Sequence, residues 1–183
     1  MQIEKEIIDY EQNKEDIEHW VTLKGEYRYE EIIEFMKKEN IKCTWENVTN
    51  YVRYDKRILI NSFKYIVFLE ELFKSFVHKY KNGNVIEQDF KICLNHFISL
   101  DEKAKYDEID INLLSKEKKS INNYRNCVVH NKILIGKSFI GKSLEQILEI
   151  YKNILPKSYR SGFIKDINNC AKGLLEGTYH IKI

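Results

Sequence analysis

Hydrophobic side chains recur at three- and four-residue steps along most of the chain, the spacing that places them on one face of an α-helix. The longest such stretch runs from Trp45 to about Tyr80, contains no Gly or Pro, and follows Thr44, a suitable N-cap residue. A wide apolar face must be buried on several sides. This stretch is therefore predicted to be a long helix that packs against several others through Ile58, Leu59, Phe63, Ile66, Val67, Leu69, Leu72, Phe73, Phe76 and Val77.

Shorter stretches with the same spacing predict further helices before and after the long one. Asp110 is placed to cap one of them, and Ser143 with Gln146 has the pattern of a capping box for another, which Pro156 ends. The expected helices cover about 29–39, 85–100, 111–131, 144–154 and 159–175, with a weaker helical pattern over 3–21, a turn at Asn82-Gly83-Asn84 and a polar loop at 101–110.

These elements predict an all-α fold, an antiparallel bundle of five to seven helices in a single domain that covers residues 1–183. The scarcity of Gly and Pro, with seven and one in the chain, agrees with this fold because both residues interrupt helices. The hydrophobic fraction of 43% and the charged fraction of 32% are typical of a globular protein.

The cysteines form no pattern typical of a metal site or a disulfide framework. They lie far apart and include no Cys-x-x-Cys pair, so we expect neither a metal centre nor disulfides. The first residues lack the cationic and apolar regions of a secretory signal, and no apolar run is long enough to span a bilayer. We therefore expect a cytoplasmic location and no membrane partner.

The net charge of +2 conceals an uneven distribution. Residues 1–110 carry 17 Lys/Arg and 23 Asp/Glu, a net −6, whereas residues 111–183 carry 13 and 5, a net +8. A basic region favours a polyanionic partner such as RNA, although scattered lysines on a solvated surface give the same count.

One segment of the basic region, Tyr124 to Asn131, brings together side chains suited to RNA cleavage. Asn126 and His130 are four residues apart and share a helix face, and Arg125 is long enough to reach toward the imidazole. A histidine can exchange a proton with a ribose 2′-hydroxyl or a leaving 5′-oxygen, and an arginine can stabilise charge on phosphate. The ordinary alternative is a surface ion pair for the arginine and a helix C-terminal position for the histidine.

The string Tyr-Arg-Asn-Cys-Val-Val-His-Asn-Lys-Ile-Leu, residues 124–134, resembles the Arg-x4–6-His motif of the HEPN superfamily, in its Abi-like (abortive infection) form. The upstream pattern over 54–72 is loosely similar too. The resemblance covers about 45–175 and leaves 1–44 as an N-terminal helical extension. It implies a helical bundle that dimerises so that two Arg/His sets line one cleft, with Arg125 and His130 as catalytic residues and Asn126 as an ancillary one.

A competing motif follows directly. Residues 136–143 satisfy the P-loop pattern G-x-x-x-x-G-K-[ST], and the apolar run 133–135 before it could be a short strand. Too few residues remain for the further parallel strands of a P-loop domain, and Phe139 and Ile140 are bulky for a loop that wraps phosphates. Lys132, Lys137 and Lys142 are instead candidates for binding RNA phosphate without nucleotide hydrolysis.

The sequence therefore predicts a metal-independent endoribonuclease that needs no cofactor, acts as a homodimer on RNA, and works in phage defence or as a toxin. The resemblance adds an antitoxin or a guide-RNA effector as a possible partner. Glu70 or Glu71 could offer a carboxylate to the cleft, or could lie at a surface or interface. The alternatives are a catalytically silent HEPN module that binds RNA or a protein, and a nucleotide-binding protein that uses Gly136–Ser143.

Overall fold

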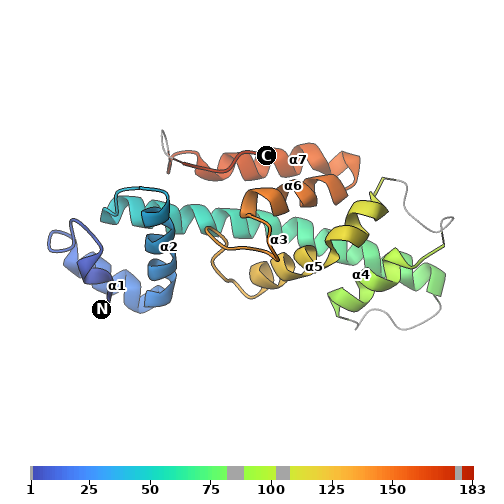
Figure 1. Ribbon diagram of the computed structural model, residues 1–183, viewed down its shortest axis with the longest axis horizontal. Coiled ribbons are helices and arrows are strands. Elements are labelled where there is room, and N and C mark those ends of the chain that lie inside the picture. The colour runs from blue at the N-terminus through green and yellow to red at the C-terminus, as the bar shows by residue number, and fades with distance from the viewer. Residues whose placement is uncertain (1, 82–88, 102–107, 176–178) are drawn as a thin grey trace.

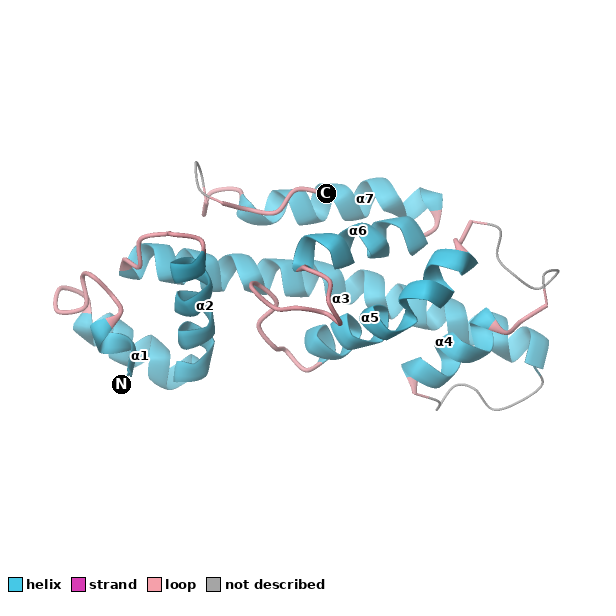
Figure 2. Ribbon diagram, viewed as in Figure 1, coloured by secondary structure: helices cyan, strands magenta, loops and turns pink. Residues whose placement is uncertain are grey.

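The computed structural model describes residues 2–81, 89–101, 108–175 and 179–183. Within these ranges the chain folds into helices joined by loops and turns, with no strand (Figure 2). The all-α class is confirmed, and the seven α-helices of the described part lie at the upper end of the expected range. The predicted turn at 82–84 and most of the polar loop at 101–110 lie outside the described residues.

A single long helix organises the molecule. Helix α3, Trp45–Lys81, runs through almost its whole length, and the other helices pack along it (Figure 1). Its start is the predicted one, since the Thr44 hydroxyl accepts a hydrogen bond from the Asn47 amide. Helices α1 (Lys14–Lys24) and α2 (Glu26–Lys38) pack near its N-terminal end, preceded by the short 3₁₀ helix η1 (Gln2–Lys5).

The remaining helices lie along the rest of α3. Helices α4 (Phe90–Ile98) and α5 (Ile111–Val129) pack near its C-terminal half, α7 (Lys157–Asn168) packs along another side of it, and α6 (Leu144–Ile154) packs against both α5 and α7. The side chain of Asp110 caps α5, and Ser143 with Gln146 forms the predicted capping box of α6. A short 3₁₀ helix, η3 (Asn169–Ala171), follows α7.

Buried tyrosines tie these helices together. Tyr124 and Tyr151 are fully enclosed between α3, α5 and α6, and Tyr51 and Tyr54 anchor the C-terminal segment. The hydroxyls of these four tyrosines all have partners, which offsets the cost of burying them. The partners are Ser62 Oγ at 2.6 Å for Tyr124, Ile121 O at 3.0 Å for Tyr151, Tyr179 O at 2.8 Å for Tyr51, and the Ile181 amide at 2.8 Å for Tyr54.

The structure corrects three predicted boundaries. Helix α4 begins at Phe90 rather than near residue 85, because the Asp89 side chain accepts the Lys91 amide and caps it there; residues 85–88 lie outside the described part. The last helix begins at Lys157, directly after Pro156, and ends at Asn168 rather than Leu175. Helix α5 ends at Val129 instead of residue 131, a difference that places the candidate catalytic histidine at the end of the helix.

The apolar run 133–135, a possible strand on the P-loop interpretation, is buried but is not a strand. Two of its amides are bonded to a side chain of α3 instead of to a neighbouring strand. None of the helices in the described ranges has the length and apolar character needed to cross a membrane.

Candidate active site

The end of α5 sets the geometry of the candidate site. Asn131 has a φ of 53°, and its amide donates to Val128 O at 3.1 Å while the Lys132 amide donates to Cys127 O at 2.9 Å. These two bonds form a Schellman motif, in which a left-handed residue closes the helix and turns the chain away. Asparagine tolerates that conformation better than most residues. His130 is therefore the last residue before a sharp change of direction.

Arg125 is held firmly at the surface of the bundle. Its Nη2 lies 3.0 Å from Glu70 Oε2 on α3, and both side chains are 19% exposed. The guanidinium also lies 5.4 Å from the ring centre of Phe90 on α4, and Nη1 donates to Asn126 Oδ1 at 3.2 Å. Lys74 lies 3.0 Å from the other oxygen of Glu70. Three helices thus fix one guanidinium, with Asn126 beside it.

Unused polar atoms remain in this part of α5. Arg125 Nε and Asn122 Oδ1 are buried and have no hydrogen-bond partner among the described residues. Asn122 and Asn126 line a groove of about 470 Å³ between α4, α5 and the turn at Ile140. Buried polar atoms normally have partners. Arg125 itself is not part of the groove wall, so of the residues around the guanidinium it is Asn126 that connects it to the groove.

His130 differs from Arg125 in its surroundings. Its side chain is exposed, and its imidazole has no hydrogen bond or ion pair within the described part of the chain. Its backbone amide continues the helix pattern by donating to Asn126 O at 3.0 Å. The structure thus brings Arg125 and Asn126 into contact and leaves His130 free to turn, five residues beyond Arg125 at the helix end.

A buried polar cluster fixes the chain directly after His130. Asp55 on α3 is fully enclosed, and its Oδ1 accepts the amides of Leu134 and Ile135 at 2.8 and 2.9 Å. Arg28 on α2 lies 3.9 Å from Asp55 Oδ2 and donates to Asn131 O at 2.8 Å. Burial raises the pKa of Asp55 to about 6, against the opposing effects of the two amides and Arg28.

The three lysines predicted to bind RNA have different environments. Lys132 is exposed beside His130 and has no ion-pair partner among the described residues. Lys137 lies 3.3 Å from Glu31 of α2, and Lys142 lies 3.3 Å from Glu117 of α5. Lys132 is therefore the lysine of the three whose charge is open to a phosphate.

The P-loop-like segment has the geometry of a tight turn. The Phe139 amide donates to Lys142 O at 2.8 Å, and Ile140 and Gly141 both have positive φ. Phe139 is completely buried and packs edge-on against Tyr124. The motif lysine, Lys142, faces a carboxylate of its own chain. Through these contacts the segment covers the hydrophobic core, which is an argument against a phosphate-binding loop at this position.

The polar cluster behind the site was not predicted, and Glu70 was only one of two acidic candidates. Glu70 contacts Arg125 whereas Glu71 is exposed, as helix geometry requires of consecutive residues. Arg28 and Asp55 are far from the motif in the sequence, and Arg28 lies just before the helix predicted at 29–39, so no local pattern joins them to the site.

No group of three or more His, Cys, Asp or Glu side chains in the described ranges is placed to hold a metal ion. No protein-family model, no curated protein and no solved structure matches the chain.

Proposed function

We propose that this protein is a metal-independent endoribonuclease of the HEPN type, which cleaves RNA by attack of a ribose 2′-hydroxyl. One observation carries the proposal. A guanidinium fixed by Glu70 and Phe90, with Asn126 beside it, precedes a histidine at the end of the same helix that has no partner among the described residues. The resemblance of residues 124–134 to the HEPN motif adds the reaction class.

The proposed reaction needs two proton transfers and one charge-stabilising group. The 2′-oxygen attacks the adjacent phosphorus and loses its proton, and the bond from phosphorus to the 5′-oxygen breaks as that oxygen gains a proton. An imidazole can perform either transfer. Arg125 would stabilise the extra negative charge on the phosphate oxygens, and Glu70 keeps its fork in place. The products are a 2′,3′-cyclic phosphate and a 5′-hydroxyl.

The same chemistry favours a homodimer. One histidine cannot act as base and acid in a single step, whereas His130 and the partner's His130 can divide these roles across a shared cleft. An exposed apolar surface lies beside the site: Ile60 is 57% exposed and Phe63 44% exposed on α3, and Val129 is 37% exposed on α5. At 100° per residue, Ile60 and Phe63 share their side of α3 with Glu70, the partner of Arg125.

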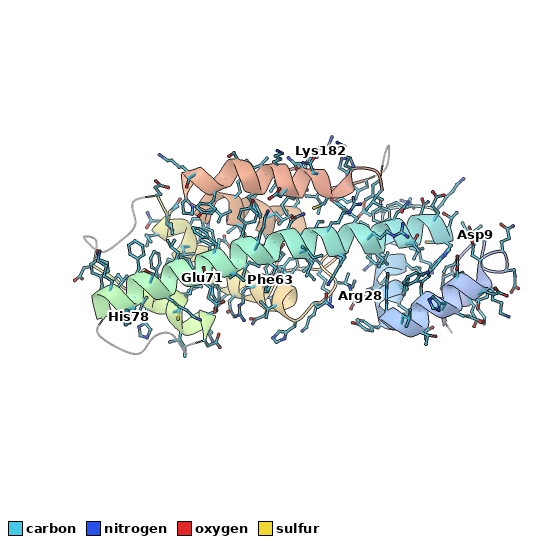
Figure 3. All side chains as sticks on the ribbon, turned by 180° about the vertical axis from the view of Figure 1, so that it is seen from behind. Asp9, Arg28, Phe63, Glu71, His78 and Lys182 are labelled. Carbon is cyan, nitrogen blue, oxygen red and sulfur yellow. The ribbon has the colours of Figure 1, made fainter. Side chains whose placement is uncertain are left out.

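Seen from behind, that side of α3 is not crossed by another helix, and Phe63 and Glu71 are labelled along it (Figure 3). Apolar side chains grouped on an open surface are typical of interaction sites. Pairing of two chains through this surface would bring the two Arg125 and His130 sets toward one axis. A role in phage defence or as a toxin, with an antitoxin or a guide-RNA effector as partner, belongs to the same proposal.

Cleavage of RNA should persist in excess EDTA, because the nucleophile is part of the substrate and Arg125 supplies the positive charge. An oligonucleotide of the same sequence made entirely of 2′-deoxy units should remain intact. Gel analysis of both substrates, with and without EDTA, makes the measurement. Loss of RNA cleavage in EDTA with recovery in Mg²⁺ would contradict the proposed mechanism.

Phe63→Glu is expected to separate the dimer, because a dimer would bury a charge in its apolar contact at a cost of several kcal/mol. Multi-angle light scattering at micromolar concentration should give twice the chain mass of 22.0 kDa for the unaltered protein and one chain mass for the variant. Ile8→Glu is the matched control, since Ile8 is 71% exposed at the N-terminal end. A monomer before any substitution would refute the dimer.

A further inference from the structure

A second surface feature lies beyond the end of α5. A pocket of about 530 Å³ opens between α1, α2 and α3, and five cationic side chains line it: Lys24, Arg28, Arg53, Lys56 and Arg57. Its described lining contains no acidic residue. Asn131, the residue directly after His130, completes the wall. The pocket therefore adjoins the candidate active site through one residue.

Two of the cations are held by the protein at the pocket wall. Arg28 is buried, with Asp55 at 3.9 Å and Asn131 O at 2.8 Å, and Figure 3 labels it below α3 on the side of α2. Arg57 donates to Cys170 O at 3.1 Å and Lys172 O at 2.8 Å. Their charges are fixed in position, so the pocket is positive before any ligand arrives.

The other three cations remain open to a ligand. Arg53 is exposed and has no ion pair or hydrogen bond among the described residues. Within the described residues Lys56 has one hydrogen bond, to the neutral Asn131 Oδ1 at 2.8 Å, and Lys24 lies over the Trp20 ring at 4.6 Å. Burial, followed by the charges of Arg53 and Arg28, lowers the pKa of Lys24. Asp55 lies next to Arg28 alone, so a bound anion would relieve the crowding of the other charges.

An aromatic ring stands at the same pocket. Tyr27 is 55% exposed, and its ring lies so close to Gly25 that a Cβ there would meet it at 2.9 Å. Gly25 joins α1 to α2 with a φ of 87°, a conformation suited to glycine. Gly25 therefore contacts the Tyr27 ring, while more than half of the side chain is exposed to solvent. Cations beside an exposed ring are the usual means of binding single-stranded nucleic acid, through phosphates and base stacking.

From these contacts we infer that the pocket binds one nucleotide of a single-stranded RNA, with its phosphate on Arg53 and Lys56 and its base on Tyr27. The inference rests on the proposed function for the identity of the strand as substrate. Asn131 connects the pocket to His130, so a strand bound there would continue past the imidazole. The pocket would position RNA, and the end of α5 would cleave it.

Binding of a fluorescent 2′-O-methyl oligonucleotide, followed by anisotropy at several salt concentrations, tests the inference separately from cleavage. This probe has no free 2′-hydroxyl. Arg53→Ala/Lys56→Ala removes two phosphate contacts and should reduce the slope of log affinity against log salt by about 1.4, since each contact contributes about 0.7 on single strands. Tyr27→Leu should weaken binding about tenfold with the slope unchanged.

Lys116→Ala/Lys165→Ala removes the same charge from exposed positions elsewhere and should leave slope and affinity as they are. Arg53→Ala alone breaks no described contact and should lower the slope by about 0.7. This single variant shows whether the result of the double variant comes from a folding defect. Equal behaviour of pocket and control variants would overturn the inference. So would displacement of the probe by equimolar ATP, which would assign the pocket to a free nucleotide.

The two proposals can fail separately. If the unaltered chain binds the probe through the pocket but cleaves no RNA, the nuclease assignment is wrong and the pocket stands. If it cleaves RNA while the pocket variants bind like the control, the pocket inference is wrong and the nuclease assignment stands.

Discussion

His130→Ala is expected to lower the rate of RNA cleavage by about 10² to 10⁴, the usual effect of losing a general acid or base. The stability of the fold should change by less than about 0.5 kcal/mol, because the imidazole is exposed and has no partner in the described structure. Single-turnover cleavage assays and thermal unfolding followed by circular dichroism measure the two effects on one preparation.

Arg125 needs a gentler substitution than alanine. Its side chain is only 19% exposed and pairs with Glu70, so Arg125→Ala would leave a largely enclosed carboxylate with Lys74 as its remaining partner and lower stability as well as activity. Arg125→Lys keeps the charge next to Glu70 but loses the planar fork that binds two phosphate oxygens. We expect the cleavage rate of this variant to fall by about as much as that of His130→Ala, while the variant folds normally.

Lys142→Ala provides the contrasting variant. Lys142 is the lysine of the P-loop-like motif, and its Glu117 contact lies away from the proposed chemistry. Cleavage should persist in this variant. Circular dichroism serves as the control that the variant is folded. An inactive Lys142→Ala protein together with an active His130→Ala protein would overturn the ribonuclease assignment and favour the nucleotide-binding alternative.

Asp55→Ala should have the largest effect on stability, lowering the free energy of unfolding by about 3 to 5 kcal/mol. The substitution leaves the buried amides of Leu134 and Ile135 without an acceptor and Arg28 without its nearby carboxylate. Chemical denaturation of both proteins measures the difference. Glu71→Ala is the control on the same helix, since Glu71 is exposed and should change stability by less than about 0.5 kcal/mol.

The effect of Asp55→Ala should also depend on pH. The folded-state pKa of Asp55, about 6, lies above the ordinary value of 3.8. The part of its contribution to stability that comes from this pKa shift is therefore complete below about pH 4 and is lost as the pH rises through about 6, while the bonds to the two amides remain. The stability difference between the two proteins should be larger at pH 5 than at pH 7.5. The opposite trend would show that the ionised form of Asp55 is the one that the fold favours.

Helical periodicity predicted most of the fold because apolar spacing and capping residues are local signals. Thr44, Asp110 and Ser143 marked helix starts correctly, since each caps through its own side chain within three residues. The end of α5 was misjudged because it depends on the left-handed backbone of Asn131. Nothing in the residues after it, Lys132 and Ile133, forbids another helical turn.

The charge distribution along the chain predicts the cationic surface only in part. The net charge is positive over residues 111–183, but Lys137 and Lys142 in that range are paired with carboxylates. The pocket of five cations belongs to the net acidic part, because α1, α2 and α3 bring Lys24, Arg28 and Arg53 to one place. The net charge of a segment does not show which charged residues the fold places next to one another, and that arrangement determines where an anion binds.

The identity of the RNA ends tests the central claim most directly. The unaltered protein should be incubated with a defined RNA oligonucleotide in EDTA, beside the His130→Ala variant, and the products weighed by mass spectrometry. A 2′,3′-cyclic phosphate on one fragment and a 5′-hydroxyl on the other, absent with His130→Ala, is the predicted result. Fragments with a 3′-hydroxyl and a 5′-phosphate, or equal cleavage by the variant, would contradict 2′-hydroxyl attack assisted by His130.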